Sequence, residues 1–203
     1  MKKIALKTVL FLVFYICIFC DVFAQKKLSK TNLTLGISML LPKDFMKMND
    51  DLLAKKYYTY RKPTAIYTDV STLIDIGVNI TNTYWDAKDL KILKDLYKGS
   101  LQASYSKVEF LQDKLVTIKK RDFIVFEFIG KIVEENDTKK AVSGKKGTLE
   151  TYNYMMYAVV ENKIIVFNFN CPLKISQEWR EPTKKMMESV KIKNLKVAEE
   201  KKK

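Results

Sequence analysis

The stretch YNYMMYAVVENKIIVFNFNC, residues 152–171, decides the fold. Two runs rich in aromatic and β-branched residues flank the polar pair Glu161-Asn162, which is the pattern of a β-hairpin with a two-residue turn. With these two residues as the turn, Val160 pairs with Lys163. That pair fixes the register of both strands, because each further pair follows by counting away from the turn.

This register sorts the side chains into two unlike faces, since successive residues of a strand point to opposite sides. One face mixes apolar residues with three carboxamides, because Asn153 comes opposite Asn170, and Asn168 comes opposite a methionine. The preceding run RDFIVFEF (121–128) predicts a third strand, with Glu127 expected on the mixed face. The other face is apolar throughout, with the pairs Tyr154–Phe169, Met156–Phe167 and Ala158–Ile165.

The rest of the chain adds strands and helices around this hairpin. Alternating apolar residues predict one strand from Leu33 to Leu41-Pro42 and further strands at 71–81 and 108–118. Asn49 is predicted to cap a short helix. This order predicts an α+β fold, in which helices cover an antiparallel β-sheet.

Two longer helices are predicted to form the layers over the sheet. The first follows Asp86 or Asp89, and its apolar stripe is typical of one buried helical face. The second follows the hairpin and buries Trp179, which is expected to meet Phe128, Phe167 and Phe169 of the sheet. The stripe of the first helix consists of Leu90, Leu93, Leu96, Tyr97 and Leu101.

The first 24 residues have the composition of a secretory signal peptide. The positive start MKK precedes an apolar run at 9–19, and Ala24 supplies a small residue for cleavage before Gln25. A membrane span needs about 20 residues, and this run is shorter. The alternative to a cleaved signal peptide is a signal anchor that is not cut. A lipid on Cys20 is not expected, because Phe19 stands where a lipobox has a small residue. The mature protein is therefore predicted to be exported, and to be periplasmic or secreted.

The residues after the predicted signal peptide are expected to form one domain between two flexible ends. Residues 25–30 are predicted to be a flexible linker, residues 31–193 a single domain and residues 194–203 a disordered basic tail. The full sequence has a net charge of +14 at pH 7 and stays strongly basic without residues 1–24, which favours anionic partners such as an anionic surface. Singly spread lysines are also typical of a solubilising surface. No basic stripe interleaved with exposed aromatic residues is present, so specific nucleic-acid binding is not expected.

The sequence offers no catalytic constellation. It contains no histidine, which excludes Ser-His-Asp and Cys-His arrangements and histidine-based zinc sites. Once the signal peptide is removed, Cys171 is the only thiol. The register places it on the apolar face opposite Tyr152, where a buried and inert side chain is expected. No metal, cofactor or enzymatic activity is predicted.

Several segments together share the pattern of a known superfamily. They are LPKDF (41–45), IDIGVNI (74–80), the leucine-rich helix, RDFIVFEF (121–128), IIVFNFNCP (164–172) and the tryptophan-containing last helix that ends in SVKI (189–192). The chain resembles the PsbP-like superfamily of α/β/α sandwiches, in the branch of small secreted bacterial proteins. The resemblance covers roughly residues 33–192. It implies a role in docking on other proteins and carries over no functional residue.

Two functions remain as expectations. The first is an exported, non-enzymatic binding or accessory protein of the bacterial cell envelope that docks on a protein partner. The second is a small-ligand-binding protein that uses a cleft on the mixed face. The candidate site is a polar patch of Glu127, Asn153, Asn168 and Asn170, because convergent polar groups in apolar surroundings mark binding sites. Alternatively, these groups meet water or satisfy loop backbone atoms.

Overall fold

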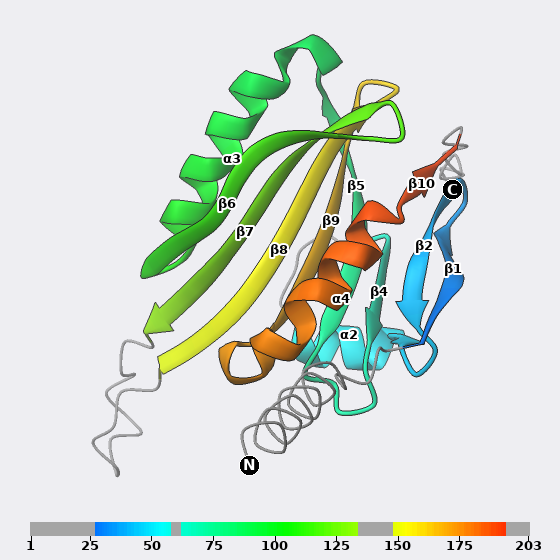
Figure 1. Ribbon diagram of the computed structural model, residues 1–203, viewed down its shortest axis with the longest axis vertical. Coiled ribbons are helices and arrows are strands. Elements are labelled where there is room, and N and C mark those ends of the chain that lie inside the picture. The colour runs from blue at the N-terminus through cyan, green and yellow to red at the C-terminus, as the bar shows by residue number, and fades with distance from the viewer. Residues whose placement is uncertain (1–26, 58–61, 134–147, 194–203) are drawn as a thin grey trace, which may run out of the picture.

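The computed structural model describes residues 27–57, 62–133 and 148–193 (Figure 1). The predicted signal peptide, with Ala24 at its end, lies outside the described residues, as do Gln25 and the predicted tail 194–203. Within the described ranges no helix is long and apolar enough to cross a membrane.

The elements follow one another in the order expected for an α+β domain. The helical segments are α2 (Asp50–Lys56), η1 (Ala87–Asp89), α3 (Leu90–Ser104), η2 (Leu173–Ile175) and α4 (Ser176–Glu188). The strands are β1 (Leu28–Thr34), β2 (Ile37–Pro42), β3 (Met46–Lys47), β4 (Ala65–Thr68), β5 (Asp75–Tyr84), β6 (Lys107–Ile118), β7 (Arg121–Val133), β8 (Thr148–Val160), β9 (Lys163–Pro172) and β10 (Lys191–Ile192).

The strands form two antiparallel sheets. The large sheet has the order β3-β4-β5-β9-β8-β7-β6, and the small sheet has the order β1-β2-β10. At the centre of the large sheet, β8 and β9 pair with Val160 opposite Lys163, as the sequence predicts. Glu161 and Asn162 have left-handed φ values of 51° and 61°, the conformation of a type I′ turn, whose twist matches that of the flanking strands. The predicted hairpin register is confirmed over its whole length.

Helices α3 and α4 lie on opposite faces of the large sheet (Figure 1). Each face carries its own hydrophobic core. On one face, α4 and the small sheet cover Phe167 and Phe169, and the ring of Trp179 lies 5.7 Å from that of Phe169. On the other face, α3 buries Leu93 and Leu101 against β7 and β8. The chain is therefore an α/β/α sandwich with a small sheet added to one outer layer.

The orientation of β7 differs from the prediction. Glu127 pairs with Tyr154 and Phe128 pairs with Asn153. Directly opposed residues point to the same face, so Glu127 lies on the apolar α4 face and Phe128 on the α3 face. The predictions for these two residues are wrong. Fourteen residues separate β7 from β8 in the sequence, so the register of this pair cannot be counted from a two-residue turn as it can for β8 and β9.

The N-terminal strand is also more divided than predicted. The expected single strand is a hairpin of β1 and β2, and Gly36 adopts a φ of 80° at its turn. The predicted linker is wrong for residues 28–30, which belong to β1. Leucine and isoleucine alternate through the turn without interruption, so periodicity alone does not show it.

The leucine stripe of α3 is confirmed only in part. Leu93 and Leu101 are buried, and Leu90 and Tyr97 pack against the same core. Leu96 is 58% exposed, so the prediction that it is buried is wrong. The buried stripe of α3 is therefore narrower than the leucine pattern indicated.

Phe167→Ala tests the hydrophobic core under α4. The Phe167 side chain is fully buried between β9 and the layer that contains α4, so truncation should lower the free energy of unfolding by about 3–5 kcal/mol. Chemical denaturation of both proteins measures the difference. Leu96→Ala, at an exposed position, should change stability by no more than about 0.5 kcal/mol, and equal losses in the two variants would contradict the assigned burial.

Candidate functional site

The three predicted asparagines come together on the α3 face of the large sheet. We refer to Asn153, Asn168 and Asn170 as the carboxamide patch. Asn153 on β8 pairs with Asn170 on β9, which in turn pairs with Asp75 on β5. Asn168 lies two residues before Asn170 on β9 and pairs with Gly77 of β5. The patch thus lies on the adjacent strands β8 and β9 in the middle of the sheet, next to β5.

The position of α3 leaves part of this face accessible. The helix packs on β6 and β7 (Figure 1), and the core beneath it includes residues of β8 such as Tyr157. Asn168 and Asn170 lie on β9, farther from this edge of the sheet, and are only half-buried. Polar side chains are thus presented beside an apolar core.

Asn153 has a structural role within this patch. It is only 6% exposed. Its side-chain nitrogen donates to the backbone oxygen of Thr151 at 3.2 Å and to the Thr151 hydroxyl at 3.0 Å. The amide hydrogens of Asn153 are therefore engaged within its own strand, which leaves Asn168 and Asn170 as the accessible members of the patch.

Asp75 extends the patch with a buried charge. Its side chain is fully buried, and Oδ2 lies 2.6 Å from the Lys56 ammonium. The Tyr57 hydroxyl donates to the same carboxylate oxygen. The other oxygen, Oδ1, has no hydrogen-bond partner among the described residues. An unsatisfied buried oxygen is costly, so Oδ1 keeps the capacity to accept a further hydrogen bond.

Tyr57 connects the buried charge to the carboxamides. Burial raises the pKa of its hydroxyl well above the ordinary value, and so do the hydrogen bond to Asp75 and the charge of Asp75. A hydrogen bond with Asn170 acts in the opposite direction. The phenol therefore stays protonated at neutral pH and serves as a hydrogen-bond donor, which is not the behaviour of a general base.

Gly77 leaves space for the side chain of Asn168. A Cβ atom placed on Gly77 would lie 2.7 Å from Oδ1 of Asn168 and 3.3 Å from Cγ1 of Ile66. The Asn168 amide rests in the space that a larger residue would fill. Gly77 therefore determines where this amide lies on the sheet.

Glu127, predicted in the same patch, belongs to a different cluster under α4. It is buried, and its Oε1 accepts a hydrogen bond of 3.0 Å from the Tyr152 hydroxyl. Arg180 of α4 lies over the Tyr152 ring, 5.7 Å from its centroid. Burial, followed by the charges of Glu127 and Glu188, raises the pKa of Tyr154 to about 12. These contacts join the sheet to α4 and account for Glu127 without a ligand.

Cys171 is the one cysteine in the described part of the chain, and its surroundings do not activate it. Cys171 is buried opposite Tyr152, as predicted, and burial raises the pKa of its thiol to about 12. A thiol in that state is a poor nucleophile. Within the described ranges, no group of three or more His, Cys, Asp or Glu residues could hold a metal ion.

Sequence reasoning missed Asp75, Tyr57 and Lys56. A signal was present, because Asp75 is the second residue of the aliphatic run IDIGVNI (74–80), on the side that also carries Gly77. A charged residue at such a position is rarely buried without a partner. Its partners, however, lie about twenty residues earlier, on α2 and the residue that follows it, and local spacing does not reveal them.

The fold has relatives among solved structures, although neither a family model nor a curated protein matches the sequence. The chain is similar to the solution structure of cyanobacterial PsbP (CyanoP) from Synechocystis, with a TM-score of 0.52, 12% identity and coverage of 86% of this chain and 97% of that chain. It is also similar to the Ran-binding protein Mog1p of Saccharomyces cerevisiae, with a TM-score of 0.50, 14% identity and coverage of 83% and 96%. At these identities the likeness shows the fold alone. The PsbP-like sandwich predicted from the sequence is confirmed, and its placement in a small secreted bacterial branch stays a prediction.

Proposed function

We propose that this domain is an exported, non-enzymatic accessory protein of the bacterial cell envelope, and that it docks on a protein partner through the carboxamide patch. The observation that carries the proposal is the half-buried pair Asn168 and Asn170 on the α3 face of the central sheet. Each carboxamide offers two donors and one acceptor. Such groups match the peptide groups of a partner's backbone.

The surroundings of the patch favour binding over catalysis. The Tyr57 phenol stays protonated, and the Cys171 thiol is buried. The sequence lacks histidine altogether. A polar surface without an activated nucleophile or a poised base supports recognition, which requires only hydrogen bonds and shape.

A second candidate function is binding of a small polar ligand at the same place. The specific observation is the unpartnered Oδ1 of Asp75 beside Tyr57 and Asn170. Surrounding residues cover this oxygen, so a hydroxyl or ammonium group of a ligand would satisfy it only after those residues move. The two functions differ in the size of the bound species, so one experiment can separate them.

A photo-crosslinking amino acid at position 168 tests partner docking. In cells that produce the protein, illumination should join position 168 to a discrete protein of the envelope fraction. The matched control carries the same amino acid in place of Asn82, an exposed asparagine near the other end of β5, and should give no such adduct. Equal labelling from both positions would contradict docking through the patch. A small-ligand function instead predicts no protein adduct and a small molecule retained by the purified protein in native mass spectrometry.

Once the partner is identified, Asn168→Ala should weaken its binding roughly 2- to 12-fold for each hydrogen bond lost. Gly77→Ala should act similarly, because the new Cβ would displace the Asn168 amide. Both variants should keep a melting temperature close to that of the parent. Unchanged affinity in both would exclude the patch as the docking site.

Export is tested separately by the mass of the mature chain. Protein recovered from the envelope or the medium should begin at Gln25, because the apolar run and Ala24 suit signal cleavage. Intact-mass spectrometry distinguishes the outcomes. A chain that still begins at Met1, or one that carries a lipid on Cys20, would contradict the proposed processing.

A further inference from the structure

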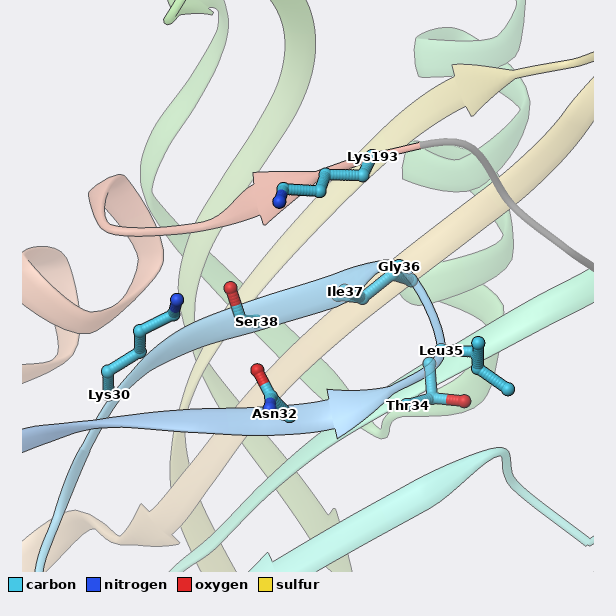
Figure 2. Close-up of a pocket in the computed structure, with 8 residues that line it drawn as sticks. All are labelled: Lys30, Asn32, Thr34, Leu35, Gly36, Ile37, Ser38 and Lys193. Atoms are coloured by element: carbon cyan, nitrogen blue, oxygen red, sulfur yellow. The ribbon is translucent and has the colours of Figure 1, made fainter.

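An open depression on the small sheet gathers positive and polar groups (Figure 2). Its volume is about 380 Å³. Lys30 and Asn32 of β1, Ser38 of β2, and Lys193, which directly follows β10, contribute side chains to its lining. None of the lining residues is acidic. The depression therefore has the composition of a site for anions.

The pairing of the small sheet places these groups on its outer face. Asn32 pairs with Ser38, which also pairs with Lys191 of β10. The alternate residue Ile37 points inward to the core. The backbone nitrogen of Lys193 donates to the oxygen of Gly36 at 2.7 Å, which holds the end of β10 against the hairpin turn. In Figure 2 the polar ends of the Lys30 and Ser38 side chains lie beside β2, and that of Lys193 lies over β10.

The positive charge at this end of the molecule is not neutralised locally. Lys30, Lys191 and Lys193 are exposed, and none forms an ion pair within the described ranges.

A fourth lysine, Lys119 of the β6–β7 turn, lies close to this group. It donates to the backbone oxygens of Ser189 and Val190 at 2.7 and 3.0 Å. Burial, together with the charge of Lys191, lowers the pKa of Lys119. An anion bound here would relieve this repulsion.

Exposed leucines accompany the lysines. Leu35, at the tip of the β1–β2 hairpin, is 68% exposed, and Leu40 on β2 is 37% exposed. Leu35 lines the same depression as Lys30 and Lys193. Lysines interleaved with exposed apolar side chains are typical of surfaces that lie at a membrane interface, where the cations meet lipid phosphates and the apolar groups enter the acyl boundary.

We propose that the outer face of the small sheet binds the phosphate groups of an anionic membrane surface through Lys30, Lys191 and Lys193, with Leu35 entering the interface. This function is additional to docking through the carboxamide patch, which lies on the other side of the large sheet. Membrane attachment through the small sheet would leave that patch free for a protein partner.

Vesicle sedimentation tests the proposal with the chain from Gln25 onward, which contains every described helix and strand. The protein should bind vesicles that contain phosphatidylglycerol, and it should not bind pure phosphatidylcholine vesicles. The double variant K191Q/K193Q should bind the anionic vesicles about 25-fold more weakly, given about fivefold for each lysine near such a surface. The matched control K91Q/K107Q loses the same charge from exposed positions on α3 and β6 and should stay within about twofold of the parent. Equal losses in the two double variants would overturn the site.

Two further arms distinguish a membrane surface from other anionic ligands. Leu35→Ser should weaken vesicle binding without changing its dependence on salt, because it removes only apolar contact. Inorganic phosphate at a few millimolar should not release the protein beyond the effect of equal ionic strength. Specific release by phosphate, or full binding by Leu35→Ser, would overturn membrane attachment. Circular dichroism of each variant should match the parent, since all five substituted side chains are exposed.

Discussion

The two-residue turn at Glu161-Asn162 is the constraint on which the rest of the structure depends. Both residues adopt left-handed φ values, so the turn aligns β8 and β9 with Val160 opposite Lys163. A slip of one residue would move every side chain of one strand to the other face. Phe167 and Phe169 would then leave the core under α4, and the carboxamides would enter it. Backbone geometry at two residues thus determines which surfaces of the large sheet are apolar.

The same register explains why a polar patch persists in a sheet with a core on each face. On the α4 face, aromatic and aliphatic side chains fill the layer, and the buried Glu127 is satisfied by Tyr152. On the other face, α3 covers the side toward β6, and the remaining half carries Asn168 and Asn170 near the buried Asp75. Asp75 requires Lys56 and Tyr57 as partners. The cost of burying a charge therefore links α2 to the half-buried carboxamides of β9.

Sequence reasoning succeeded where local geometry decides the outcome. The β8–β9 register follows from a turn of two residues, and the cap of α2 follows from Asn49, whose side chain accepts from the Leu52 nitrogen. It failed where distant segments decide. Glu127 was placed on the wrong face because alternation along β7 does not reveal how that strand meets β8. Asp75 was missed because its partners, Lys56 on α2 and Tyr57 after that helix, are remote in sequence. Leu96 is exposed because the buried stripe of α3 is narrower than its leucines indicate.

Cross-strand contacts between backbone α-protons, measured by solution NMR, test the hairpin register most directly. In an antiparallel sheet the α-carbons of close pairs lie about 4.5 Å apart, so their α-protons give strong contacts. We expect such contacts between Asn153 and Asn170 and between Met155 and Asn168, the pairs set by the turn. Contacts of Asn153 with Phe169 or Cys171 in their place would show a register shifted by one residue, and would contradict both the burial of the core and the position of the carboxamide patch.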